Sequence, residues 1–234
     1  MARLLLVSSS NVHGTGYLDH VEPWLLRLFE GRRRVLFVPY ALADRDGYAA
    51  KARARFAGFG LGLDSLHEAA DPRAAAAAAE GFFVGGGNTF RLLDTLQRLG
   101  LVEAIAARVA AGAPYMGTSA GSNVACPTIK TTNDMPIVEP AGFAALDLVP
   151  IQLNAHYLDP EPGSTHKGET REQRIAEFHE ENATPVLGLR EGSMLEVDGA
   201  RASLEGVAGA RLFRRGRAPE ELRPGADLSA LLAR

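Results

Sequence analysis

Residues 117–121 read Gly-Thr-Ser-Ala-Gly and match the Gly-x-Ser-x-Gly pattern of a nucleophile elbow. In such an elbow, a sharp turn between a strand and a helix exposes the serine hydroxyl, and small flanking residues let the backbone pass close to the helix. Residues 113–116 form a plausible strand directly before the turn. The pattern therefore predicts that Ser119 is a nucleophile. The alternative is an incidental serine in a glycine-rich turn.

A serine hydroxyl is a weak nucleophile until a base accepts its proton, and the chain has six histidines. His156 follows a short predicted strand at 151–153, and active-site residues of open parallel sheets lie beyond the carboxyl ends of strands. His166, in a loop, is the rival. His179 lies in a charged helical segment and is expected to be solvated. Position therefore favours His156 as the base.

A base of this kind is oriented by a carboxylate, and two candidates stand out. Glu191 follows a predicted strand at 186–190, which places it at a carboxyl end. Asp134 lies in the segment 131–136. The alternatives are an exposed turn carboxylate for Glu191 and a residue that caps backbone amides for Asp134. Strand-end placement favours Glu191.

The glycines at 85–87 follow another predicted strand and precede Asn88. Glycine lets backbone N–H groups approach a ligand closely, so this segment could supply a donor to an oxyanion hole. A phosphate-binding turn is the alternative, but neither glycine pattern of nucleotide-binding loops fits. Cys126 follows the elbow by seven residues, and we expect it to be a small buried residue rather than a nucleophile.

Short apolar strands alternate with helical stretches over the first half of the chain, which predicts a mostly parallel sheet covered on both faces. Strands are predicted at 4–8, 35–38, 63–66, 82–84 and 115–116, and helices at 18–29, 48–59, 71–80, 89–99 and 102–111. Four later strands, at 186–189, 194–197, 201–204 and 211–213, predict an antiparallel addition at one sheet edge. A hairpin is expected at Asp198-Gly199, and irregular, functional loops are expected at 126–150 and 157–168.

Length and composition exclude several classes of protein. The 234 residues suit a single domain spanning 1–234, and a net charge of −3 argues against nucleic-acid binding. One cysteine permits neither an internal disulfide nor a cysteine-rich zinc cluster. The apolar run at 4–7 is too short for a signal segment, and nothing approaches the ~20 apolar residues of a membrane span. We therefore expect a cytoplasmic protein without metal, cofactor or membrane partner, and the later strands leave a homodimer open.

Several segments together resemble peptidase family S51, the peptidase E or α-aspartyl dipeptidase family. They are residues 83–90, 119–121, 126–138 and 166–172. The resemblance spans nearly the whole chain in order. It implies a serine peptidase that cleaves Asp-Xaa dipeptides through an acyl-enzyme on Ser119. It also implies a three-layer α/β fold similar to class I glutamine amidotransferases, with serine in place of their cysteine.

Carried over by position, the resemblance makes Ser119 the nucleophile, His156 the base and Glu191 the third member, with Asp134 also near the site. It places the oxyanion hole at the backbone amides of Gly87 and Ala120.

The substrate carries an extra carboxylate, and arginine suits carboxylate binding. We therefore expect Arg171 to bind it, together with Asn88 and His166 in substrate binding. Thr118 stands where close relatives in the family are expected to have tryptophan, and the loop 158–165 diverges from the family pattern. These two differences leave the shape of the substrate pocket undetermined. The alternatives are a cyanophycinase-like peptidase, another serine hydrolase such as an esterase, or a non-catalytic small-molecule binding protein.

Overall fold

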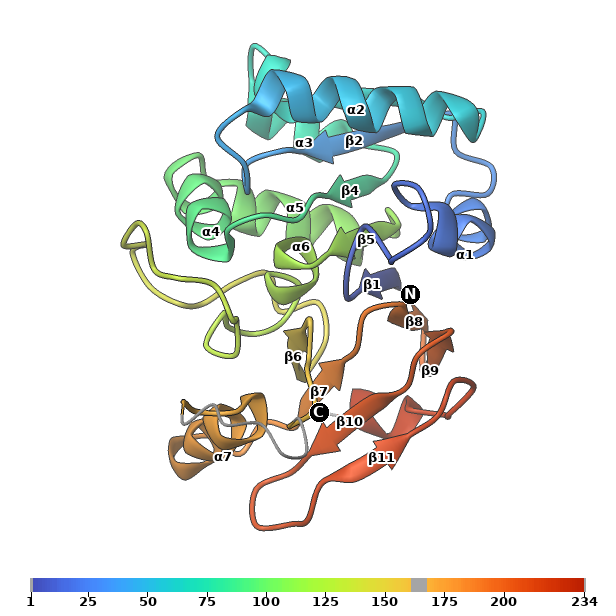
Figure 1. The fold of residues 1–234 in the computed structure, drawn as a ribbon. Helices are drawn as coiled ribbons and strands as arrows, with labels where there is room; N and C mark the ends of the chain where they lie inside the picture. The colour runs from blue at the N-terminus through green and yellow to red at the C-terminus, as the bar shows by residue number, and fades with distance from the viewer. Residues whose placement is uncertain (1, 161–167, 234) are drawn as a thin grey trace.

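The computed structural model describes residues 2–160 and 168–233. Its larger sheet has seven strands in the order β3-β2-β4-β5-β1-β8-β9 (Figure 1). The first five in that order run parallel, and β8 and β9 are antiparallel additions beside β1. The strands are β1 (Arg3–Val7), β2 (Arg34–Val38), β3 (Gly62–Ser65), β4 (Phe82–Val84), β5 (Tyr115–Thr118), β8 (Ser193–Asp198) and β9 (Arg201–Gly206).

Helices cover both faces of this sheet, as the alternation of strands and helices predicts. Leu4 and Leu6 of β1 pack into one core, whereas Leu5 and Val7 pack into the core on the opposite face. Because both faces are covered, the strand is apolar along its whole length. The first core receives α3 (Pro72–Ala78), α4 (Thr89–Arg98), α5 (Leu101–Ala110) and α6 (Ala120–Asn123), and the second receives α1 (Glu22–Leu28) and α2 (Arg45–Gly58).

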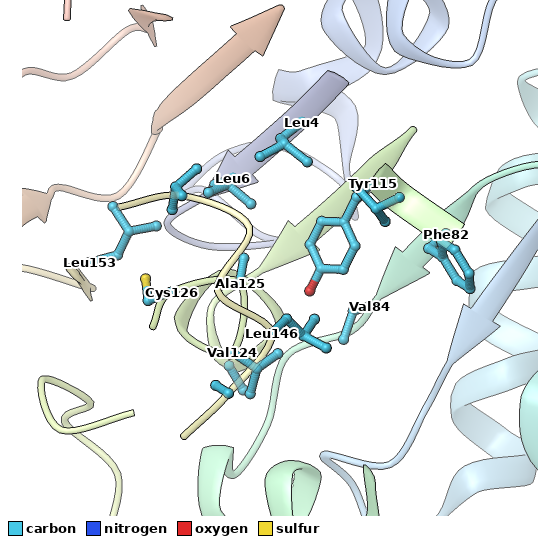
Figure 2. Packing of buried hydrophobic residues seen from close by; sticks show 14 of the residues in the cluster. Leu4, Leu6, Phe82, Val84, Tyr115, Val124, Ala125, Cys126, Leu146 and Leu153 are labelled. Atoms are coloured by element: carbon cyan, nitrogen blue, oxygen red, sulfur yellow. The ribbon is translucent and has the colours of Figure 1, made fainter. Parts of the chain in front are cut away.

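The first of these cores continues beneath α6, where it joins the large sheet to the rest of the chain. Figure 2 shows Leu6 and Tyr115 of the large sheet with Leu153, which belongs to another strand. The hydroxyl of Tyr115 donates a 2.6 Å hydrogen bond to the carbonyl oxygen of Gly121. This bond satisfies a buried polar group and anchors the turn that begins α6.

Four strands form a second sheet, in the order β11-β10-β7-β6. They are β6 (Gln152–Ala155), β7 (Val186–Leu189), β10 (Ala210–Phe213) and β11 (Glu220–Leu222), and α7 (Arg171–Glu181) packs beside them (Figure 1). The fold class is confirmed, and β8 and β9 form the predicted hairpin at the sheet edge. The prediction that strands 186–189 and 211–213 join that same edge is wrong. They pair with each other in the second sheet, where β7 also pairs with β6 and β10 with β11, because strand pairing depends on partners distant in sequence.

The sequence also predicts that segment 126–150 is irregular and that His179 is solvated. Residues 126–150 are irregular apart from an isolated bridge between Thr128 and Ala144, as predicted. His179 is 8% exposed, so the expectation that it is solvated is wrong. Its ring lies on the inner face of α7, with Nδ1 3.2 Å from the Asn182 carbonyl oxygen. Across residues 2–160 and 168–233, no helix combines the length and the hydropathy that a membrane crossing requires.

Candidate active site

Ser119 lies at the junction between β5 and α6 with φ 51° and ψ −111°. A residue with a side chain rarely adopts positive φ, and such strain is typical of functional sites. Two hydrogen bonds join this turn to β1: the Ser119 amide and the Ser122 hydroxyl both donate to the Val7 carbonyl oxygen, at 3.0 and 2.7 Å. The end of β1 thus holds the strained turn in place.

The two glycines of the Gly-x-Ser-x-Gly pattern are required by close backbone approach. A Cβ atom on Gly117 would collide with the backbone of Gly121, and one on Gly121 would collide with the carbonyl oxygen of Val84. No rotamer change relieves a clash with backbone atoms. The structure therefore gives segment 117–121 the elbow geometry that the sequence predicts.

His156 and Glu191 come from neighbouring strands of the second sheet. His156 directly follows β6, and Glu191 lies two residues beyond β7. His156 Nε2 is 2.9 Å from Ser119 Oγ, and His156 Nδ1 is 2.8 Å from Glu191 Oε1. The three side chains form a continuous hydrogen-bonded line, in the arrangement that activates a serine nucleophile.

Ser8 ties this line of side chains to the large sheet. The His156 amide donates to Ser8 Oγ at 2.9 Å, and Ser8 Oγ donates to the Leu189 carbonyl oxygen at 2.8 Å. His156 itself has φ 55°, so its backbone also adopts an uncommon conformation. Ser8 therefore sets the position of the imidazole relative to the elbow. Sequence reasoning missed it, because only its place at the end of β1 marks it.

Asp134 has a different environment from Glu191. Its Oδ2 atom accepts hydrogen bonds from the Thr89 amide at 2.8 Å, the Thr89 hydroxyl at 2.5 Å and the Thr132 hydroxyl at 3.2 Å. Thr89 is the first residue of α4, where backbone N–H groups lack helical partners. The structure thus places Glu191 against His156 and Asp134 at the beginning of a helix.

The predicted oxyanion-hole donors flank the nucleophile. A Cβ on Gly86 would lie 3.1 Å from the Cβ of Ser119, so the glycine segment runs directly beside the serine. Gly87 has φ 136°, and a Cβ there would lie 2.6 Å from the Ala41 carbonyl oxygen. Ala120 begins α6, so its amide has no helical acceptor. The glycine segment and the beginning of α6 therefore lie on either side of Ser119, and the oxyanion-hole role of the Gly87 and Ala120 amides stays a prediction.

Known proteins resemble this chain in sequence and in fold. Residues 4–205 match the model of Peptidase family S51. The chain belongs to this family. It is 58% identical to Peptidase E of Streptomyces coelicolor, over 98% of this chain and 94% of that protein. It is 50% identical to the Drosophila melanogaster protein named "Probable alpha-aspartyl dipeptidase", over 98% of this chain and 97% of that protein.

A solved structure shows the same fold at low sequence identity. The crystal structure of a peptidase from an acI-B1 actinobacterium superposes with a TM-score of 0.72. It is 17% identical, and the match covers 97% of this chain and 96% of that one. The same fold therefore occurs in a protein whose sequence differs at most positions.

A cleft beside Ser119 has a volume of about 550 Å³. It is lined by the described residues Ser9, Ser10, Asn11, Tyr17, Leu42, Asp44, Gly47, Tyr48, Lys51, Gly86, Gly87, Ser119, Asp134 and His156. The phenol of Tyr48 packs directly on Gly85, and burial raises the pKa of this phenol, which keeps it neutral. Tyr48 and Lys51 had no signal in the sequence, because both lie on α2, remote from the motifs.

The three residues predicted to bind substrate lie in different parts of the chain, and the structure describes two of them. The Asn88 side chain caps α4, since its Oδ1 accepts from the Arg91 amide at 3.0 Å and its Nδ2 donates to the Met135 carbonyl oxygen at 2.8 Å. Arg171, half-buried, begins α7; burial and the like charge of Arg174 lower its pKa, while Asp134 acts in the opposite sense. His166 lies outside the described residues.

Proposed function

We propose that this chain is a serine dipeptidase that hydrolyses dipeptides with N-terminal aspartate. Membership of family S51 supports peptidase activity, and the names of the relatives support the aspartyl dipeptide as substrate. The observation that carries the proposal is the 2.9 Å contact between Ser119 Oγ and His156 Nε2, extended to Glu191 at 2.8 Å. A binding protein would not require a strained serine against a carboxylate-oriented imidazole.

The chemistry follows from these positions. His156 accepts the proton of Ser119 as Oγ attacks the peptide carbonyl carbon of Asp-Xaa. The oxyanion is held by the Gly87 and Ala120 amides. His156 then donates the proton to the leaving amine, and Xaa departs as a free amino acid. Water, deprotonated by His156, hydrolyses the aspartyl ester and restores Ser119. The base contributes ~10²–10⁴-fold and one oxyanion donor ~10²–10³-fold.

The aspartate side chain gives the substrate its second requirement, a fixed cation. We assign this role to Arg171, which is supported by the electrostatic influence of the cleft-lining Asp134 on its guanidinium and by the absence of an ion pair to it in the described part of the chain. Guanidinium suits the planar carboxylate, because two parallel N–H groups match its two oxygens. We also propose a cytoplasmic location, supported by the single cysteine, which permits no internal disulfide.

Replacing the nucleophile tests the proposal directly. Ser119→Ala should lower turnover of Asp-Leu by about 10⁴-fold or more, because the covalent route is lost. Ser203→Ala, on the edge strand β9, is the matched control and should retain full activity. Thermal unfolding of both variants checks that the fold survives, and a chelator should leave the wild-type rate unchanged. Substantial hydrolysis by Ser119→Ala would overturn the assignment.

A panel of substrates distinguishes the proposed activity from those of other serine hydrolases. Asp-Xaa, Asn-Xaa, β-aspartyl peptides and acyl esters would each identify a different serine hydrolase, including a cyanophycinase-like peptidase. A fluorophosphonate label on Ser119 distinguishes any of these from a non-catalytic binding protein, because the label requires an activated serine. Preference for Asp-Leu over the rest of the panel is the expected result.

A further inference from the structure

One face of α2 contributes a cation to the active-site cleft. Asp44, Gly47, Tyr48 and Lys51 all line the cleft, and their spacing places them on the same side of the helix. The Lys51 ammonium lies 4.4 Å from the centroid of the Tyr17 ring, which itself lines the cleft. An aromatic face attracts a cation and limits where the flexible lysine side chain goes.

The charge on Lys51 is not neutralised by a protein carboxylate. Within residues 2–160 and 168–233, Lys51 forms no ion pair, and it is the single lysine or arginine that lines the cleft. Among the described residues, the two carboxylates that line the cleft accept hydrogen bonds from backbone amides: Asp44 from Gly47 at 2.9 Å and Asp134 from Thr89 at 2.8 Å. The cleft therefore presents an available ammonium group.

The position of Lys51 differs from that of Arg171. Lys51 extends from α2, which packs into one core of the large sheet, whereas Asp134, near Arg171, caps α4, which packs into the core on the opposite face. Ser119 lies at the carboxyl end of the central strand β5, between the helices that cover the two faces of the sheet. An Asp-Xaa dipeptide likewise carries two carboxylates on either side of its scissile bond: the aspartate side chain and the free C-terminus of Xaa.

We propose that Lys51 binds the C-terminal carboxylate of the leaving residue and so restricts hydrolysis to dipeptides with a free C-terminus. The inference rests on the proposed function and adds a specificity determinant to it. The C-terminal carboxylate forms and breaks no bond during the attack on the scissile carbonyl, so its interaction with Lys51 is equal in the bound substrate and the transition state. Such uniform binding affects KM and leaves kcat unchanged.

The test compares Asp-Leu with Asp-Leu-amide, which lacks the C-terminal carboxylate. Lys51→Met removes the charge and keeps the length of the side chain. The matched control is Arg53→Met on the same helix, where the arginine pairs with Glu68 at 2.8 Å outside the cleft. For Asp-Leu, Lys51→Met should raise KM about 10- to 100-fold with kcat nearly unchanged, whereas Arg53→Met should change neither.

For Asp-Leu-amide, the wild type should already show the higher KM, and Lys51→Met should change it less than about twofold. Lys51→Arg should recover most of the lost affinity for Asp-Leu, because the charge is restored. Equal losses on Asp-Leu and its amide would overturn the inference, as would a selective loss on Asp-Leu relative to Ala-Leu, which would assign Lys51 to the aspartate side chain. Failure of the wild type to cleave Asp-Leu would instead overturn the proposed function, and this inference with it.

Discussion

The role of Glu191 can be tested by removing its charge alone. In the wild type, His156 Nδ1 lies 2.8 Å from the Glu191 carboxylate. In Glu191→Gln the amide oxygen can still accept the hydrogen bond from His156 Nδ1. Two unit charges with centres about 4 Å apart attract by about 1 kcal/mol in bulk water and about 4 kcal/mol near a protein surface. The Glu191 side chain is 51% exposed, which favours the lower part of this range.

The imidazolium that forms during the reaction should therefore lose roughly 1–3 kcal/mol of stabilisation. This corresponds to about a 5- to 150-fold fall in kcat/KM for Asp-Leu. The free energy of unfolding should change little, because the carboxylate is half exposed and its net contribution to stability is small. Steady-state kinetics on Asp-Leu and urea unfolding measure the two quantities on the same preparation.

Asp134→Asn is the matched comparison, because it also exchanges a carboxylate for an amide, at a residue that lines the cleft. The three hydrogen bonds from Thr89 and Thr132 stabilise the beginning of α4, so this variant should lose roughly 0.5–2 kcal/mol of unfolding free energy. Its kcat/KM should fall less than that of Glu191→Gln. A larger loss of activity in Asp134→Asn than in Glu191→Gln would refute the reasoning and make Asp134 the group that supports the base.

Two further outcomes are expected. Arg171→Ala should lower kcat/KM for Asp-Leu about 10- to 100-fold and leave Ala-Leu unchanged, because only the first substrate has a side-chain carboxylate to bind; equal losses would reject that role. Burial raises the pKa of the Cys126 thiol to about 12, so at pH 8 the native protein should resist iodoacetamide and react only after unfolding in urea. Mass spectrometry follows the label, and rapid alkylation of the folded chain would contradict the buried placement.

Much of the site follows from short segments of sequence. The elbow at 117–121 is predictable because its glycines are a local requirement of one tight turn, and the structure shows the clashes that other residues would cause there. Asp71 and Pro72 begin α3 as expected, with Asp71 Oδ1 accepting from the Arg73 amide. The Asp198-Gly199 hairpin is equally local. Each of these features depends on a few consecutive residues.

Other features depend on residues far apart in the chain. Sequence position made both Asp134 and Glu191 candidates, and only the pairing of β6 with β7 brings Glu191 to His156. The same pairing creates the second sheet and positions α7, on which His179 is buried. Asn88 could be assigned to substrate by motif, yet in the structure its side chain caps α4.

The sequence by itself thus determined the elbow at residues 117–121, the alternation of strands and helices, and the family resemblance. Tertiary structure alone decided which carboxylate meets His156, that Ser8 holds the backbone of His156, and that Lys51 lines the cleft. The physical reason is the range of the interactions involved. Turns, caps and helical periodicity are settled by neighbouring residues, whereas strand pairing and helix packing join segments that are separated in the chain, such as β6 with β7 and β1 with β8.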